Sequence, residues 1–222
     1  MNFLNKIIAL LVVFLGLQMQ GQEKITVRMT PPTQKLVVLY NAEGAQQKYV
    51  THADGVDGVF TLIIPSNAPN ASYRLVYNRE TMDYVDFLYV GKSFELSFNP
   101  EKKEELPVFV GSDENKRFYE YLFKINSFQD KMDSVQVEVF KTQDATAIAE
   151  MNSKYLKYQL ELKKTVDLVE TKETNILIKD ILKAHERVLP ENPIQNPEEY
   201  LPFVKKHFFD HIDFNNNNLI HS

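Results

Sequence analysis

Two histidines near the C-terminus have the spacing of a metal-binding pair. His207 and His211 are four residues apart, so on a helix they share one face, and imidazoles placed in this way can bind zinc. The metalloprotease version has a glutamate beside the first histidine, whereas Phe208 and Phe209 follow His207 here. Asp213 is no more than a guess for a third ligand. We interpret the segment as a helix with an aromatic face and keep a zinc-dependent hydrolase as an alternative.

Other catalytic patterns are weaker still. Paired carboxylates perform glycoside hydrolysis, and the candidates are Glu101, Glu104, Glu105, Asp83 and Asp86. These acids fall in predicted loops or on exposed strand faces, so we interpret them as surface charge. The segment 54–58 lacks the twelve-residue ligand pattern of a calcium loop, and the sequence contains neither a glycine-rich phosphate loop nor a Gly-x-Ser-x-Gly motif. The sequence therefore predicts no catalytic residue, no metal ligand and no cofactor.

Tyrosines are the other group that could contact a ligand or a partner. The candidates are Tyr73, Tyr77, Tyr84 and Tyr89 in predicted strands and Tyr155 and Tyr158 in a predicted helix. The strand tyrosines would suit a small molecule or a glycan if they gathered around a pocket, and burial of the rings would argue against that function. Packing against the helices is the plainer interpretation of the strand tyrosines. Core packing is the plainer interpretation of Tyr155 and Tyr158, because they lie at heptad spacing.

Composition excludes several classes of function. The chain has 222 residues, of which 44% are hydrophobic and 12% aromatic, so it can form a substantial core. Its net charge is −5 and it has no concentrated basic tract, so we expect no nucleic-acid partner, because phosphate neutralisation needs clustered cations. The chain has no cysteine, which excludes thiol redox chemistry within it.

The segment Met1–Gln22 has the pattern of a secretory signal peptide. Lys6 precedes an apolar run, Ile7–Leu17, whose 11 residues are fewer than the roughly 20 that a membrane-spanning helix needs. The small residue Gly21 fits signal-peptidase cleavage near Gly21/Gln22. We therefore expect a chain exported to the periplasm or cell envelope, with no transmembrane segment after cleavage.

The elements that must position these residues change character near residue 110. Short β-branched and aromatic runs separated by turn signals precede it, and they predict an antiparallel β-sandwich or barrel domain over residues 23–110. The predicted strands are Ile25–Met29, Lys35–Asn41, Gln47–His52, Val59–Ile64, Ser72–Asn78, Tyr84–Val90, Ser93–Asn99 and Leu106–Val110. Gly91-Lys92 lies between two of these runs and predicts a hairpin there.

The pattern from 111 to 222 predicts a helical domain, and the whole chain is therefore of the α+β class. Ser112 is a good N-cap for the first helix, and a heptad-like apolar stripe predicts a second helix from Asp144 to Val169 that pairs with it in antiparallel fashion. Thr174 is the expected cap of a third helix over Asn175–Val188, and a fourth is expected over Glu198–Ile212.

Three segments resemble a known family. They are Asp54–Thr61 (DGVDGVFT), Val108–Tyr121 (VFVGSDENKRFYEY) and Tyr200–Leu219 (YLPFVKKHFFDHIDFNNNNL). Together they resemble the N-terminal accessory region, a small β-domain followed by helices, of thioredoxin-like thiol–disulfide interchange proteins of the Bacteroidetes envelope. The resemblance covers nearly all of Glu23–Ser222.

The resemblance implies an accessory role. In that family the chemistry belongs to a C-terminal thioredoxin domain with a Cys-x-x-Cys pair, which this sequence lacks, so no catalytic residue carries over. The expected role is to position a redox domain, to dimerise, or to select an envelope partner. The abrupt end after Asn215–Asn218 favours an excised part of a longer protein over a natural short version. Our leading prediction is a non-catalytic, exported interaction module, and the alternative is a periplasmic small-molecule or glycan-binding protein.

Overall fold

The computed structural model of the chain describes residues 22–44 and 46–220. The predicted signal peptide, apart from Gln22, lies outside the described residues. The described chain forms a strand-rich N-terminal region followed by helices, which confirms the predicted α+β class. Over these residues, every helix is too short or too polar to cross a membrane.

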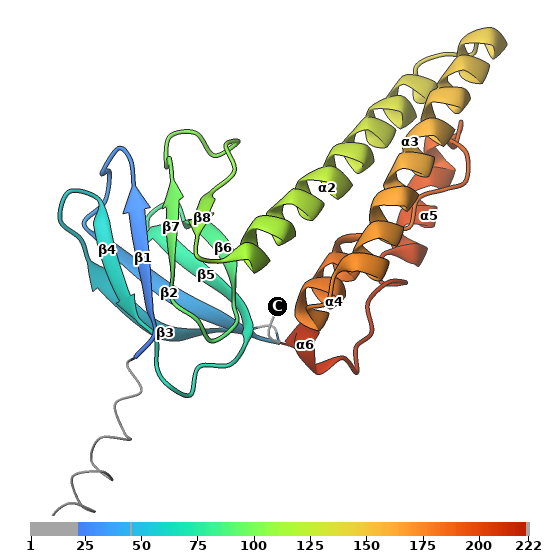
Figure 1. The fold of residues 1–222 in the computed structure, drawn as a ribbon. Coiled ribbons are helices and arrows are strands. Elements are labelled where there is room, and N and C mark those ends of the chain that lie inside the picture. The colour runs from blue at the N-terminus through green and yellow to red at the C-terminus, as the bar shows by residue number, and fades with distance from the viewer. Residues whose placement is uncertain (1–21, 45, 221–222) are drawn as a thin grey trace, which may run out of the picture.

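Eight strands form two packed sheets in the N-terminal region (Figure 1). The strands are β1 (Lys24–Met29), β2 (Leu36–Glu43), β3 (Gln46–Asp54), β4 (Val59–Ile63), β5 (Ala71–Asn78), β6 (Asp83–Tyr89), β7 (Phe94–Phe98) and β8 (Val108–Val110). One sheet has the order β4-β1-β7-β8 and the other β3-β2-β5-β6. The predicted sandwich is therefore confirmed.

Both sheets contribute to one apolar core. Ile25 and Leu96 come from the first sheet, and Leu39, Leu75 and Phe87 come from the second; all five are fully buried in the same cluster. Side chains alternate between the two faces of a strand, so the period-two pattern of the sequence supplies this inner face. Burying each large apolar side chain contributes about 1.5–3 kcal/mol to folding.

The hairpin predicted around Gly91-Lys92 is wrong. β6 and β7 belong to different sheets, and the turn, with a positive φ at Gly91, carries the chain from one sheet to the other. β7 instead pairs with β8 and, in parallel register, with β1, where Ile25 lies opposite Phe94. β6 and β7 are adjacent in sequence but lie in different sheets. Each therefore supplies apolar side chains to the shared core from its own sheet, and the apolar side chains of both strands are buried.

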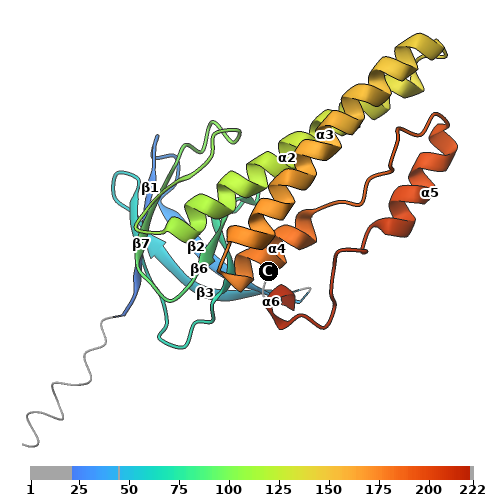
Figure 2. The same ribbon diagram turned by 45° about the vertical axis from the view of Figure 1, so that its right-hand side comes forward.

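The helical region is built from five helices of the described chain. They are α2 (Asp113–Phe140), α3 (Ala145–Lys172), α4 (Ile176–His185), α5 (Pro197–His207) and α6 (Asn217–Ile220). α2 and α3 form a long antiparallel pair, as predicted. The pair projects away from the sandwich (Figure 1). α5 lies beside this pair at the end of long connections (Figure 2).

Side-chain caps start the helices. The Ser112 hydroxyl accepts from the backbone N–H of Asn115 at 3.3 Å, and the Asp144 carboxylate accepts from that of Thr146 at 3.0 Å, which confirms both predicted starts. Thr174 does not cap α4; its backbone N–H donates to the Glu173 carboxylate, and it lies one residue before the helix cap. The cap is Asn175, one residue later.

A second apolar core joins α2, α3 and α4. It contains Ile125 and Met132 from α2, Leu162 and Val169 from α3, and Ile178 from α4. These positions follow the spacings of three and four residues that the sequence shows, so the predicted helical stripe is confirmed.

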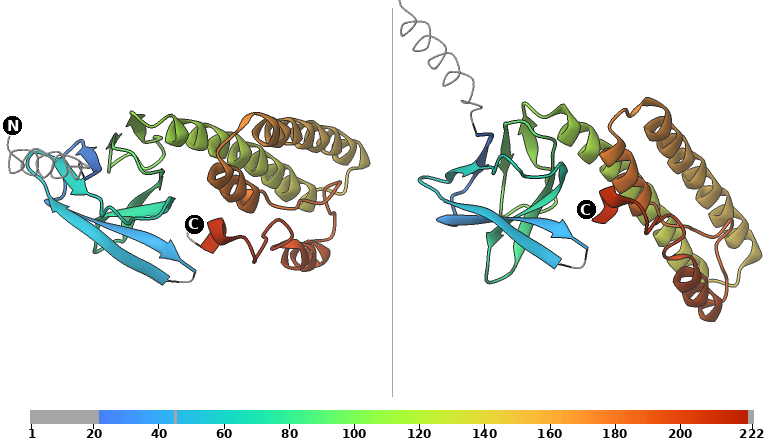
Figure 3. Two further views of the ribbon diagram at one scale, coloured as in Figure 1. Left: turned by 60° about the horizontal axis from the view of Figure 1, so that its bottom comes forward. Right: turned by 90° about the horizontal axis from the view of Figure 1, so that it is seen from below.

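The sandwich and the helices meet at the N-terminal end of α2 (Figure 3). The Asn115 amide donates to the Leu88 carbonyl at 2.8 Å, and its oxygen accepts from the Leu88 N–H at 2.7 Å. Leu88 lies on β6, an edge strand of its sheet. An unpaired edge is open to aggregation, and Asn115 here takes the place of a neighbouring strand.

Candidate functional site

The two histidines of the predicted metal pair do not share a helix. α5 ends at His207, so the predicted helix 198–212 is five residues too long and His211 lies in a turn. Asp210 and Asp213 disfavour continuation, because negative charge is unfavourable at a helix C-terminus. His207 Nδ1 lies 2.6 Å from an Asp210 carboxylate oxygen, whereas His211 Nδ1 lies 3.0 Å from the Glu186 carbonyl. Within 22–44 and 46–220, no three ligand-type side chains gather to hold a metal.

Three of the four strand tyrosines are buried, so the expected aromatic surface is wrong as a set. Tyr73, Tyr77 and Tyr89 belong to the sandwich core. The Tyr73 hydroxyl donates to the Pro69 carbonyl at 2.9 Å, and burial raises the pKa of Tyr73 to about 12. Tyr84 has 48% of its surface exposed. It is an odd number of residues from Tyr89 on the same strand, so the two side chains point to opposite faces.

The helical tyrosines are also core residues rather than a partner surface. Tyr155 is buried in the helical core, and burial raises its pKa above the ordinary value. Tyr158 is half-buried and packs against the same core. The heptad spacing therefore marks the seam between α2 and α3, as the plainer interpretation predicted.

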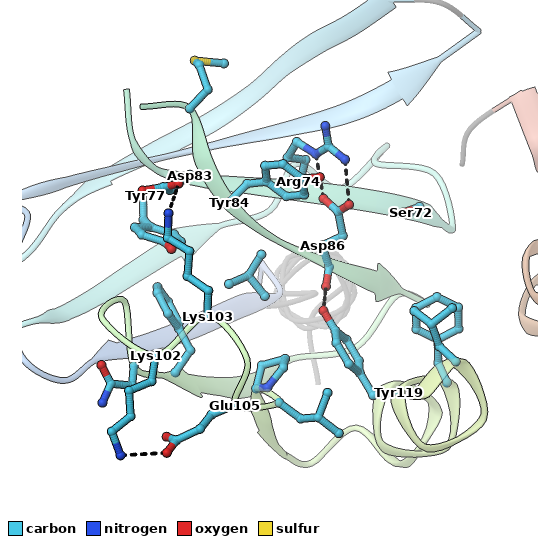
Figure 4. Close-up of a pocket in the computed structure, with 18 of the residues that line it drawn as sticks. Ser72, Arg74, Tyr77, Asp83, Tyr84, Asp86, Lys102, Lys103, Glu105 and Tyr119 are labelled. Carbon is cyan, nitrogen blue, oxygen red and sulfur yellow. Dashed lines mark hydrogen bonds and ion pairs between the residues drawn. The ribbon is translucent and has the colours of Figure 1, made fainter. Parts of the chain in front are cut away.

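A cavity lies where the sandwich meets the helices. We call it the junction cavity. Its volume is about 660 Å³. Its walls are β5 and β6, the end of β7 with the loop that follows it, the first turns of α2, and Ile181 and His185 of α4 (Figure 4). Ligand sites are commonly clefts of roughly 300–1,000 Å³ between domains, so the size and position suit a small ligand.

One wall of the junction cavity carries an ordered stack of polar and aromatic groups. Arg74 donates to both carboxylate oxygens of Asp86, at 2.8 and 2.7 Å. The Arg74 guanidinium carbon lies 3.6 Å from the centre of the Tyr84 ring. The bond to Asp86 raises the pKa of Arg74, which therefore stays charged. The pair comes from opposed positions of β5 and β6.

The opposite wall is the loop between β7 and β8. Lys103 on this loop forms an ion pair with Asp83 at the start of β6, and this bond lowers the pKa of Asp83. Lys102 binds Glu105 within the loop at 2.7 Å. The ion pair between Lys103 and Asp83 thus links this loop to β6 (Figure 4).

Helix α2 closes the third side. The Tyr119 hydroxyl donates to the Asp86 carbonyl at 2.6 Å, and burial raises the pKa of this phenol. Figure 4 shows the Tyr119 side chain reaching from the helix toward Asp86 on the strand. Asp86 is therefore held at both its carbonyl and its carboxylate.

Sequence reasoning missed most of this site. Tyr77 and Tyr84 line the junction cavity, and so do Asp83, Asp86 and Glu105, which we predicted to be surface charge. The sequence pattern does not single out Arg74 or Tyr119. Side chains alternate between the two faces of a strand, so Arg74, which lies between the inward-facing Tyr73 and Leu75, must face outward. This alternation was a usable signal that Arg74 could belong to a surface site. Its partner depends on strand register, which a single sequence does not reveal.

A second surface of interest follows α5. Phe208, Phe209 and Phe214, which we call the aromatic cluster, are 64%, 55% and 72% exposed. The Phe208 and Phe209 rings meet edge to face at 4.8 Å, and Phe209 lies 5.6 Å from Phe214. In α5, which is described throughout, no side chain is buried. Contiguous exposed rings of this kind mark interaction sites.

Comparisons with known proteins do not identify the chain. We compared it with protein-family models, with curated proteins and with solved structures. None of the three gave a significant match.

Proposed function

We propose that the chain is a non-catalytic, exported interaction module whose aromatic cluster docks a thioredoxin-like redox domain in the cell envelope. The observation that carries the proposal is the exposure of Phe208, Phe209 and Phe214 beside a helix with no buried side chain. An amphipathic helix normally buries its apolar face. A protein partner would supply the missing cover, since aromatic residues are enriched in the cores of such interfaces.

The attachment of α5 supports a docking role. The Gln136 side chain binds both the N–H and the carbonyl of Ile194, at 2.9 and 2.7 Å, just before the helix begins. The Tyr200 ring meets Phe140 edge to face at 5.6 Å. These contacts hold one side of α5 and leave the aromatic cluster facing solvent. The choice of a redox domain as partner rests on the family resemblance of the sequence.

The first test is the intact mass of the native polypeptide in envelope fractions of its source cell. We expect a mass well above the 25.8 kDa of this chain, with a Cys-x-x-Cys domain in the remainder. A mass of about 23–24 kDa, expected after loss of a signal peptide, together with no thioredoxin-like protein crosslinked to the aromatic cluster, would contradict the proposal.

The second test measures docking directly. Calorimetry between the purified chain and that redox domain should show binding that Phe209→Ser with Phe214→Ser weakens about tenfold or more, since buried aromatic anchors dominate interfaces. Phe123→Ser is the matched control, because Phe123 is equally exposed but lies on α2. Equal losses in both variants would contradict docking at the cluster. Sedimentation of the free chain would reveal self-association through the same residues instead.

A further inference from the structure

Strand β6 lies at the edge of its sheet, and its outer side is covered over only part of its length. The Asn115 amide binds the N–H and C=O groups of Leu88, and the Tyr119 hydroxyl donates to the Asp86 carbonyl. Backbone groups of alternate residues in an antiparallel strand point to the same side, so the backbone groups of Tyr84 also point away from β5. Within the described residues, the N–H and C=O of Tyr84 and the N–H of Asp86 have no partner. We call these three groups the open edge of β6.

The open edge of β6 borders the junction cavity. Tyr84 and Asp86 both line the cavity, as does Val85 between them. Figure 4 shows the strand that carries Tyr84 and Asp86 on one side of the cavity and the loop with Lys103 and Glu105 on the other. The unpaired strand edge therefore has space beside it, and the volume of about 660 Å³ lies within the range of roughly 300–1,000 Å³ that ligand sites have.

Apolar side chains lie on the inner side of this edge. Val85 and Phe98 pack against the sandwich core, and the Tyr77 and Phe98 rings are 4.8 Å apart between centres. All three residues line the cavity, together with Leu106 of the loop, which is 46% exposed. A segment that extended the sheet beyond β6 would direct every second side chain to the face that Val85 occupies. Apolar side chains at those positions would remove this apolar surface from water, which favours binding.

The charged groups of the cavity favour an uncharged ligand. Its three Lys and Arg side chains and its three carboxylates form three ion pairs: Arg74 with Asp86, Lys102 with Glu105, and Lys103 with Asp83. A charged ligand group buried there would have to break one of these pairs or remain unpaired, and both cost free energy. Uncharged side chains therefore fit the inner face of an added segment.

We propose that the open edge of β6 binds an extended peptide segment of another protein, which adds to the sheet as a further strand and places uncharged apolar side chains in the junction cavity. In an antiparallel arrangement the Tyr84 N–H and C=O match the C=O and N–H of one peptide residue, and the Asp86 N–H matches a second peptide carbonyl. Main-chain hydrogen bonds of this kind give affinity, and pockets for alternate side chains give specificity. Asn115 and Tyr119 of α2 end the added strand, because they already bind the edge from the Asp86 carbonyl onward. The inference is independent of docking through the aromatic cluster, which lies on another element.

Fluorescence anisotropy with synthetic peptides and the full chain tests the proposal. The array contains labelled peptides of about six residues, a usual strand length, in which Val, Leu or Phe alternates with Ser or Thr. Matched peptides carry Glu in place of each apolar residue. We expect at least one apolar peptide to bind, and its Glu counterpart to bind about tenfold more weakly or not at all.

Backbone methylation of the peptide that binds then tests strand addition in the unaltered chain. An N-methyl group removes a backbone donor and blocks that edge of the peptide, and alternate residues of a strand direct their N–H groups to opposite edges. Two peptides are therefore made, one methylated at odd positions and one at even positions. One pattern should weaken binding about tenfold or more and the other should change it little, because only one edge of the peptide meets β6.

Substitution of Tyr84 tests the same edge from the side of the protein. Tyr84→Pro removes the unpaired N–H and costs β6 no bond to β5, since proline is tolerated where the N–H of an edge strand faces outward. It should weaken peptide binding about tenfold. Tyr84→Ala is the matched control, because it loses the same ring but keeps the N–H, so it should bind the peptide more tightly than Tyr84→Pro. Thermal unfolding verifies the fold of both variants, and the test with methylated peptides needs no variant.

Three results of these measurements would overturn the proposal. They are the absence of binding by every apolar peptide, equal effects of the two methylation patterns, and equal binding of the apolar peptides and their Glu counterparts. Sedimentation that shows a dimer of the free chain, lost in Tyr84→Pro, would also overturn it, since the open edge would then belong to a second copy of this chain. Substitutions in the aromatic cluster should leave peptide binding unchanged, so the two proposals fail separately.

Discussion

The sandwich and the helical region bury their polar groups in different ways. In the sandwich the buried side chains are apolar or aromatic, with the exception of Asn41 on β2, and backbone groups are satisfied by strand pairing. The buried polar side chains from residue 112 onward are Ser112, Asn115, Gln129, Gln136 and Glu173. Each of the last four binds the backbone of a segment outside its own helix.

This difference shows how side chains of the helical region fix the backbone of segments that lie outside the helices. Neighbouring strands of a sheet satisfy one another's backbone N–H and C=O groups, whereas a helix has no spare backbone groups along its length. The amides of Asn115 and Gln136 each bind both the N–H and the carbonyl of one residue, Leu88 and Ile194 respectively. A side-chain amide thus performs the pairing that a neighbouring strand would provide.

Phe87→Ala would test how much apolar burial in the sandwich core stabilises the protein. It should have the largest effect on the free energy of unfolding. Phe87 is fully buried, stacks on Tyr73 at 6.0 Å and meets Phe94 of the opposite sheet at 5.3 Å. We expect a loss of about 3–5 kcal/mol in the free energy of unfolding, measured by urea denaturation. Tyr49→Ala, at an exposed strand site, should change it little. A loss below 1 kcal/mol in Phe87→Ala would mean that this core is not the main source of stability.

Asn115→Ala would break the link between the two regions. The Leu88 N–H and carbonyl would lose their partners in a buried setting, so we expect a loss of about 2–4 kcal/mol. Calorimetry should then resolve separate transitions for the sandwich and the helices. Asn126→Ala is the control on the exposed face of α2. A single sharp transition in Asn115→Ala would show that other contacts couple the regions.

Glu173→Gln would test a buried charge between helices. The Glu173 side chain is 1% exposed and accepts from Arg117 at 2.9 Å and from the backbone N–H groups of Thr174 and Asn175. Burial opposes its ionisation, but these bonds outweigh it and hold the pKa below the ordinary 4.5. The substitution should lower stability by about 2 kcal/mol at neutral pH.

The pH dependence of that loss follows from the direction of the shift. Because the folded carboxyl has the lower pKa, its stabilising contribution is complete above the unfolded pKa, near 4.5, and disappears as the pH falls through the folded value. The difference between the unaltered chain and Glu173→Gln, from urea unfolding, should therefore shrink in acid. If the difference in the free energy of unfolding did not change with pH, the loss of stability would come from the altered side-chain shape and not from the loss of its charge. Glu161→Gln, at an exposed pair with Lys164, is the control.

Gln136→Ala should have the smallest effect on stability, about 1 kcal/mol, because only the segment before α5 loses its anchor. Hydrogen exchange should become faster in α5 while α2 and α3 stay protected. Gln143→Ala, at an exposed loop position, should leave exchange unchanged. Unaltered protection of α5 in Gln136→Ala would mean that the Tyr200–Phe140 contact holds the helix by itself.

Local patterns in the sequence determined the elements of this protein. Period-two runs marked the strands, the three-and-four spacing marked α2 and α3, and the oxygens of Ser112 and Asp144 marked helix starts. These signals depend on residues within a few positions of one another. They were therefore readable without a partner or an alignment.

Only the tertiary structure decided which elements meet. β7 pairs in parallel with β1, nearly 70 residues earlier, rather than with the adjacent β6, and this choice depends on the sheets closing over one core. The same closure buried Tyr73 and Tyr89, left Tyr84 exposed, and set Arg74 opposite Asp86 beneath Tyr119. Register and packing over long separations are properties of the whole chain, so the junction cavity became visible only when the two regions were placed together.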